Sequence, residues 1–177
     1  MISKSLLIII AGCLLVLPSC GYSTNSLMPS GVDRIAVDVF GNDTFYREIE
    51  FQLTREITAE INHRAALRVS RRRNADAVLT GKIVSVSRPT MVETRNNLVS
   101  EQAVLVTAAV ELRSVATGKL LANFVLANRA EFVVERGESL QSAFDEALKD
   151  LAEDIINELE RQSYHSDLEK VRAKVPE

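Results

Sequence analysis

The chain has 177 residues, of which 21 are Lys or Arg and 24 are Asp or Glu, so its formal net charge is −3. This length suits one folded domain behind a leader, with enough residues to bury a real core. The acidic balance argues against a nucleic-acid binder, and an aromatic content of 5% without any Trp argues against stacking platforms and aromatic cages.

The first predicted element is a secretory signal peptide over residues 1–19. Lys4 is the only charge in it, and an apolar run of about 12 residues follows from Leu6 to Leu17. A membrane-spanning helix needs about 20 residues of this kind. The run therefore favours a cleaved signal over a permanent anchor or a buried helix.

Cys20 is the predicted site of cleavage and lipid attachment. It closes the segment 17–20 (LPSC), in which Pro18 is unusual for a bacterial lipobox, whereas the segment 10–13 (IAGC) before Cys13 matches the lipobox better. A cut before Cys13 would leave an apolar region of only about seven residues, at the lower limit for a signal. Spacing therefore favours Cys20, where two or three acyl chains such as palmitate would hold the protein firmly in a membrane.

Residues 20–33 are rich in turn-forming residues and are interpreted as a lipidated tether. Apolar residues then alternate with small or polar ones over 35–39, which predicts a half-buried strand. The segment 41–44 (GNDT) ends this strand and offers N-caps for a helix over about 46–63. That helix carries one apolar stripe, formed by Ile49, Leu53, Ile57 and Ile61.

A short strand over 67–69 and a polar break at 71–74 precede a long strand over 77–86. In this strand, one side is predicted to carry Leu79 and Ile83 and the other Val78, Val84 and Val86. Gly81 indicates that another part of the chain approaches the strand closely. The loop 88–98 that follows contains three apolar residues, Met91, Val92 and Leu98, which fit either a partner contact or a small extension of the core.

Two long strands, over about 99–114 and 120–135, alternate apolar and polar residues and are joined by a turn in which Gly118 permits a positive φ. A last helix over 139–161 has an unbroken apolar stripe and an otherwise acidic surface. Residues 162–177 lack an apolar period and are predicted to be a flexible tail.

This order of elements predicts an α+β fold over residues 34–161. Two helices with one apolar stripe each would pack on one face of a mainly antiparallel four-stranded sheet. The sequence shows no internal repeat and no second domain.

No catalytic constellation is visible, so we expect neither an enzyme nor a cofactor. The two histidines, His63 and His165, have no neighbours at metal-ligand spacing. The glycines form no phosphate-binding loop, and no G-x-S-x-G nucleophile motif occurs.

Arginines are the best candidates for binding. Five of them fall within residues 64–73 of this acidic chain: Arg64, Arg68, Arg71, Arg72 and Arg73. The planar guanidinium group matches phosphate oxygens, so on a membrane-tethered domain the cluster could meet lipid phosphates. An ordinary solvated loop is the alternative.

Several short motifs, taken in order, resemble the LptE family of lipopolysaccharide-assembly lipoproteins. They are CGY at 20–22, IAV at 35–37, FGN at 40–42, ADAVLTGKI at 75–83, the hairpin from Leu112 to Gly118, and the closing amphipathic helix. The resemblance covers about residues 20–160, which is nearly the whole chain after the leader.

The resemblance implies an outer-membrane lipoprotein that faces the periplasm, plugs and helps to assemble the LptD β-barrel, and binds lipopolysaccharide. Gly21 agrees with sorting to the outer membrane, because Asp at this position is the usual retention signal. The family's lipid-binding residues are basic and lie in and near strand-end loops. The corresponding candidates here are Arg71, Arg72, Arg73, Lys82, Arg88 and Arg95.

An alternative interpretation is a different periplasmic lipoprotein with a similar order of strands and helices, of the type that activates penicillin-binding proteins or takes part in secretion. Such a module would also begin at a lipidated cysteine, but its partner would be a peptidoglycan synthase or a secretion protein.

Overall fold

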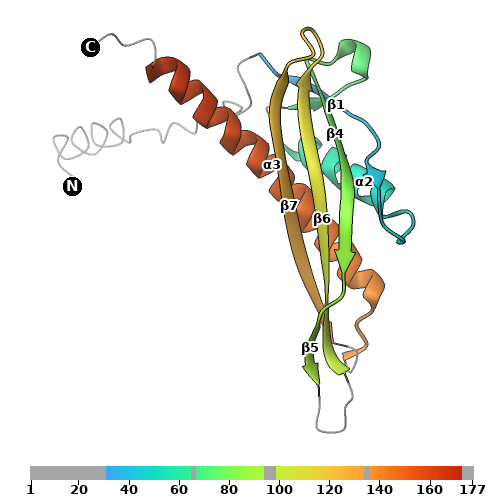
Figure 1. The fold of residues 1–177 in the computed structure, drawn as a ribbon. Coiled ribbons are helices and arrows are strands. Elements are labelled where there is room, and N and C mark those ends of the chain that lie inside the picture. Colours follow the sequence, from blue (N-terminus) through green and yellow to red (C-terminus); the bar gives the residue numbers. More distant parts are fainter. Residues whose placement is uncertain (1–30, 65–66, 94–98, 134–135, 173–177) are drawn as a thin grey trace, which may run out of the picture.

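The computed structural model describes residues 31–64, 67–93, 99–133 and 136–172 (Figure 1). Two long helices, α2 (Ile49–His63) and α3 (Leu140–Arg172), and a short 3-10 turn, η1 (Arg72–Asn74), accompany the strands. The strands are β1 (Arg34–Val37), β2 (Gly41–Asn42), β3 (Arg68–Val69), β4 (Ala77–Ser87), β5 (Thr90–Glu93), β6 (Val99–Ser114) and β7 (Leu120–Val133).

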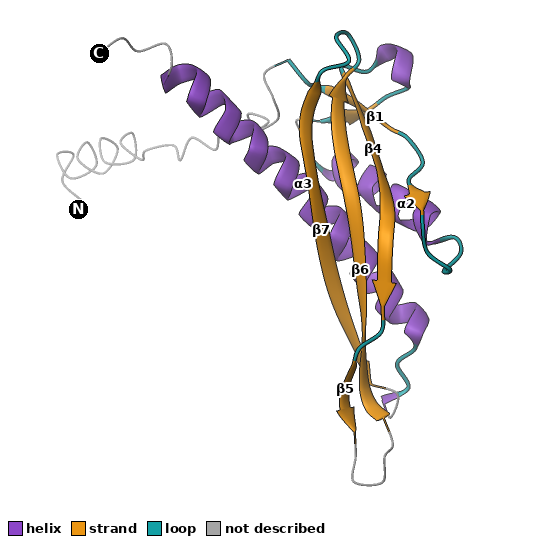
Figure 2. Cartoon of the chain, viewed as in Figure 1, coloured by secondary structure: helices purple, strands orange, loops and turns teal. Residues whose placement is uncertain are grey.

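The seven described strands form one mixed sheet, with both helices on the same face (Figure 2). Strands β4, β5 and β7 are antiparallel to β6, whereas β1 lies parallel to both β3 and β4. The prediction of two helices on one face of a sheet is confirmed, but a mainly antiparallel sheet of four strands is too simple. Because the chain crosses over through helix α2 after β1, strands β3 and β4 run parallel to β1. Strands β2 and β3 have only two residues each, which is too short for an apolar period to be visible in the sequence.

The core lies between the sheet and the helices. In β6 the predicted inward positions are all fully buried: Val104, Val106, Ala108, Val110 and Leu112. The predicted stripe of α2 is buried as well, from Ile49 to Ile61, and α3 contributes buried residues from Ala143 to Leu159. The apolar periods of β6, α2 and α3 therefore predicted correctly which face of each element is buried.

A β-bulge at Val84 changes the face of the end of β4. Ile83 pairs with Ala108 and Ser85 pairs with Thr107, so Val84 is an extra residue in the ladder. One extra residue shifts the alternation, and Val86 therefore lies against the core on the side of Ile83. The prediction that Val86 faces away from Ile83 was wrong for this reason.

Gly81 makes room for an aromatic ring, as its place within a strand predicted. A Cβ atom added at Gly81 would lie 2.5 Å from Cε1 of Phe40 and 2.6 Å from the carbonyl oxygen of Ala109. Phe40 itself is only 2% exposed. The missing side chain of Gly81 thus allows the Phe40 ring to lie directly on the strand.

The segment before α2 forms a small structure of its own instead of the first helical turn. The side chain of Asn42 donates to the carboxylate of Glu50 (2.8 Å) and accepts from the backbone N–H of Thr44 (2.9 Å). Glu48 then adopts a left-handed conformation with a φ of 71°, and no side chain caps the helix. These contacts delay the start of the helix from the predicted residue 46 to Ile49.

Helix α3 is longer than the predicted 139–161 and continues to Arg172. Residues beyond 161 contain good helix formers, and each additional residue adds one backbone hydrogen bond to an existing helix. Side-chain contacts support this continuation: Arg161 is paired with Glu158 at 2.6 Å, and the hydroxyl of Ser163 donates to the carbonyl of Leu159. The predicted boundary between a domain and a tail at 161 therefore falls inside a helix.

Candidate functional site

One end of the sheet is where the described chain begins. We call it the tether end; it comprises the start of β1, strand β3 and the turn η1, and Figure 1 places it opposite β5. The amide of Arg68 donates to the carbonyl of Asp33 at 3.0 Å, and the amide of Ser70 donates to the carbonyl of Ile35 at 2.9 Å. The segment that carries the arginine cluster is therefore bonded directly to the first strand.

Asp76 organises the tether end. Its carboxylate accepts hydrogen bonds from the backbone amides of Arg34 (2.9 Å) and Asp33 (3.2 Å) and forms a 2.8 Å ion pair with the Arg34 side chain. The side-chain hydrogen bond from Arg34, helped by these backbone donors, lowers the pKa of Asp76 below its ordinary value. The Asp76 carboxylate is thus occupied by bonds that hold β1 beside β4. Asp76, in the Ala75-Asp76 pair just before β4, therefore has a structural role.

The predicted arginine cluster is divided by the fold. Arg64 at the end of α2 donates to Glu60 (2.9 Å) and to Glu160 (2.7 Å) and Asn157 (2.8 Å) of α3, so it joins the two helices. Burial lowers the pKa of Arg64, but the hydrogen bonds with Glu60 and Glu160 outweigh it and leave the pKa above its ordinary value. Arg64 is thus committed to the α2–α3 interface.

The other four arginines remain on the surface and form what we call the arginine patch: Arg68, Arg71, Arg72 and Arg73. Arg72 makes a 2.9 Å ion pair with Asp38, with 69% of its side chain exposed. For Arg68, Arg71 and Arg73 the described parts of the chain supply no ion pair or side-chain hydrogen bond. Three guanidinium groups are therefore available to a ligand.

The remaining basic candidates do not join this patch. Lys82 lies in the middle of β4, paired with Asp43 at 2.6 Å, and Arg88 follows the far end of β4 and donates to Gln102 at 3.1 Å. The strand between the patch and Arg88 has 11 residues, which spans about 36 Å. Arg95, like the proposed anchor Cys20, lies outside the described residues. The six predicted positions therefore do not form a single site.

Part of the predicted loop 88–98 is a strand. Met91 and Val92 belong to β5, which pairs with the start of β6 in an irregular register. The sequence did not predict this strand because it has only four residues.

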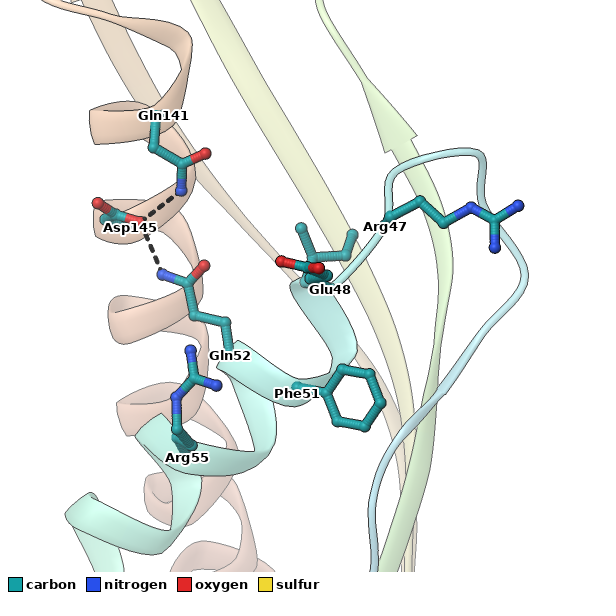
Figure 3. A pocket seen from close by; sticks show the side chains of 8 residues that line it. Arg47, Glu48, Phe51, Gln52, Arg55, Gln141 and Asp145 are labelled. Atoms are coloured by element: carbon teal, nitrogen blue, oxygen red, sulfur yellow. Dashed lines mark hydrogen bonds between the residues drawn. The ribbon is translucent and has the colours of Figure 1, made fainter.

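A cleft of about 460 Å³ opens between the N-terminal ends of α2 and α3 (Figure 3). Gln52 of α2 and Gln141 of α3 both donate to Asp145, at 2.7 and 2.9 Å, which closes one side. Arg47 and Phe51 point to the other side, away from this network. Gln52, Gln141 and Asp145 thus bond to one another, whereas Arg47 points away from them, so the polar groups of the cleft do not converge on one point.

The face of the sheet opposite the helices carries a mixture of charged, short polar and apolar side chains. Val125 of β7 is 61% exposed there, and a shallow hollow near it is lined by Thr80, Ala109 and Asn123. The described residues include no group of His, Cys, Asp and Glu that could hold a metal ion. No helix in the described part of the chain has the length and apolarity needed to cross a membrane.

Comparison with known proteins places this geometry in a family. The family model named LptE, lipopolysaccharide-assembly, matches residues 32–162, which includes the whole sheet, α2 and most of α3. No curated protein matches the chain.

Solved structures of distant sequence share the fold. The hypothetical protein CT253 from Chlamydia trachomatis has a TM-score of 0.56 and 8% identity, over 75% of this chain and 98% of that chain. The protein XCC0632 from Xanthomonas campestris has a TM-score of 0.56 and 10% identity, over 80% of this chain and 94% of that chain. The uncharacterized lipoprotein B from Nitrosomonas europaea has a TM-score of 0.51 and 12% identity, over 80% and 89%. At these identities the likeness concerns the fold alone.

Proposed function

From the premise that the chain belongs to the LptE lipopolysaccharide-assembly family, we propose that it is an outer-membrane lipoprotein that serves lipopolysaccharide insertion as the partner of an LptD-like β-barrel. In this proposal Cys20 carries the lipid anchor, and the domain faces the periplasm. It plugs the barrel and assists its assembly. The chain acts by binding and carries no catalysis of its own.

The observation that carries this proposal is the extent of the family match. Residues 32–162 include every buried residue on the helices up to Leu159 and all seven strands, so the match concerns the whole folded unit and not a short motif. The short motifs at 35–37, 40–42 and 75–83 contain residues of β1, β2 and β4, and both β1 and β2 pair with β4.

The basic candidates serve this proposal as separate contacts. Lys82 in the middle of β4 and Arg88 at its end lie on the exposed part of the sheet, while the arginine patch lies at the tether end. A barrel or a lipopolysaccharide molecule that covers a long sheet would meet such groups at several points. Arg95, which lies outside the described residues and follows β5 in the sequence, belongs to the same set of candidate contacts.

The direct test is affinity isolation of the tagged full chain from detergent-solubilised envelopes. We expect a large outer-membrane β-barrel and lipopolysaccharide to be isolated with it, and we expect depletion of the protein to lower surface lipopolysaccharide. Enrichment of a peptidoglycan synthase or a secretion protein, with unchanged surface lipopolysaccharide, would contradict the proposal and favour the alternative lipoprotein module.

The anchor is tested separately by mass spectrometry of the mature N-terminus. An acylated Cys20 is expected, and Cys20→Ser should abolish lipidation, whereas Cys13→Ser should leave it intact. Lipidation that persists in Cys20→Ser would show that Cys13 carries the lipid anchor, and it would leave the proposed partner unaffected.

A further inference from the structure

We infer that the arginine patch docks on the anionic phosphate headgroups of the membrane leaflet that holds the lipid anchor, and so orients the domain at that membrane. This inference rests on the proposed lipid anchor at Cys20. It concerns phospholipid headgroups at the base of the molecule, as distinct from a lipopolysaccharide molecule held elsewhere on the sheet.

The first argument is the position of the patch relative to the anchor. The described chain begins at Gly31, and the backbone carbonyl of Asp33 accepts a 3.0 Å hydrogen bond from the backbone amide of Arg68 in the patch. An extended chain covers at most about 3.6 Å per residue, so the segment from Cys20 to Gly31 reaches no farther than about 40 Å. A tether of this length keeps the patch at a high effective concentration near the headgroups.

The second argument is the local charge. Three carboxylates lie beside the patch, and two of them are already paired: Asp76 with Arg34 and Asp38 with Arg72. Among the described carboxylates of the tether end, Asp33 alone remains to oppose Arg68, Arg71 and Arg73, so this end is positive on a chain whose net charge is −3. An anionic surface therefore attracts this end and repels the acidic remainder.

The third argument is that the arginine side chains suit phosphate and are carried by a well-packed turn. Guanidinium groups present a planar fork of donors that fits two phosphate oxygens at once. Arg71 to Arg73 are carried by the turn η1, whose closing hydrogen bond runs from the amide of Asn74 to the carbonyl of Arg71 at 2.8 Å. Ala36, Ala75 and Val78 form a small buried cluster beside this turn. The donors are therefore mounted on a packed turn, which lowers the entropy cost of binding.

The test uses the mature lipidated protein, first verified by mass spectrometry, in vesicles of phosphatidylcholine with or without phosphatidylglycerol. If Cys20 is acylated and Cys13 is removed with the leader, the chain has no free thiol. A fluorophore can then be attached through Asn74→Cys beside the patch or through Ser87→Cys at the other end of β4. A quencher fixed to the lipid headgroups reports which end lies at the surface.

We expect phosphatidylglycerol to increase quenching at position 74 and not at position 87. The variant Arg68→Ser/Arg71→Ser/Arg73→Ser should lower the ratio of docked to undocked protein by about 100-fold, since each of the three arginines near an anionic surface contributes roughly a fivefold factor. The matched control Arg47→Ser/Arg55→Ser/Arg136→Ser removes the same charge from arginines that have no ion pair in the described residues, and it should dock like the unmodified protein. High salt should abolish the difference, because it shortens the Debye length from about 8 Å.

Equal quenching with and without phosphatidylglycerol, or an equal loss in both triple variants, would overturn the inference. So would docking that requires lipopolysaccharide in the vesicle and is not supported by phosphatidylglycerol. Absence of an acyl chain on the purified protein would instead refute the anchor, and isolation of the wrong partner would refute the proposed function; neither result resembles a loss of docking. Thermal unfolding of both triple variants serves as the check that the fold is intact.

Discussion

At the scale of single residues, Asp76 decides how the first strand joins the sheet. One carboxylate receives two backbone amides and one guanidinium group, so three donors near the start of β1 depend on it. Because these donors stabilise the ionised form, the pKa of Asp76 is lowered in the folded protein. A group whose pKa is lowered by folding stabilises the folded state above its ordinary pKa and loses this contribution as the pH falls.

We therefore predict a pH-dependent cost for Asp76→Asn. At neutral pH the variant should unfold about 2–4 °C below the unmodified protein, as expected for the loss of one favourable interaction in a domain of this size. The difference should be constant above about pH 5, shrink below about pH 4 and vanish once the pH falls through the lowered pKa of Asp76. Thermal unfolding across this pH range measures it, and a difference that stays the same down to acidic pH would show that charge is not the cause.

Residue patterns predicted some of these contacts and missed others for a physical reason. Gly81 was expected to have a close neighbour, and it does, but its neighbour Phe40 is remote in the sequence and could not be named. Arg64 was counted with the patch because it is close to it along the chain, whereas its partner Glu160 is 96 residues away. A single sequence shows spacing along the chain, and these contacts depend on which elements pack together.

At the scale of elements, the bulge in β4 sets the register of the sheet. Before Val84, alternate residues of β4 face the core in step with β6, and after it the alternation resumes one residue later. Val86 reaches the core only because of this shift. The sequence predicted the strand and, to within one residue, its limits, since these depend on a local period, but the extra residue depends on pairing with β6.

Deletion of Val84 should consequently be tolerated better than deletion of Thr80. Without Val84, the pairs Ile83–Ala108 and Ser85–Thr107 become neighbours in a regular ladder, and both parts of the strand keep their faces. Without Thr80, residues 81–83, between the deletion and the bulge, each move to the opposite face of the sheet. Lys82 then faces the core, which is costly for a charged side chain. Chemical denaturation should show a loss of about 1–3 kcal/mol for the first variant and no cooperative transition for the second. Equal losses would mean that Val84 does not act as a bulge.

The same reasoning separates the predictable helices from the unpredictable sheet topology. Both helices were located from their apolar stripes, because a stripe is a property of one element. Parallel pairing of β1 with β4 and β3 is a property of the assembled sheet. The candidate site has the same limitation: the arginines could be identified from composition, but their division into a free patch and an interhelical link required the packing of α2 against α3.

At the scale of the whole molecule, α3 connects the two ends of the domain. Among the residues whose burial the structure describes, up to Tyr164, the buried ones of α3 run from Ala143 to Ser163, and the helix lies against β6, β7 and α2. The family match ends at residue 162, which coincides with the end of this buried stripe. We therefore predict that the folding unit ends near this described buried stripe, before the end of helix α3 at Arg172.

This definition predicts the outcome of truncation. A fragment of residues 32–164 keeps every side chain of α3 that the structure describes as buried. It should melt cooperatively, within about 2–4 °C of the longer chain 32–177. A fragment ending at residue 150 loses four large buried side chains: Leu151, Ile155, Ile156 and Leu159. Each contributes about 1.5–3 kcal/mol through burial, so their sum is comparable to the entire stability of a domain, about 5–15 kcal/mol.

The shorter fragment should therefore lack a cooperative transition in calorimetry and bind a dye that detects exposed apolar surface. The two fragments also distinguish the helix from the core, because only the shorter one removes apolar side chains of α3 that the structure describes as buried. If the fragment 32–164 also failed to fold, residues after 164 would have to contribute to the folded unit, and the limits set by the buried stripe of α3 would be wrong.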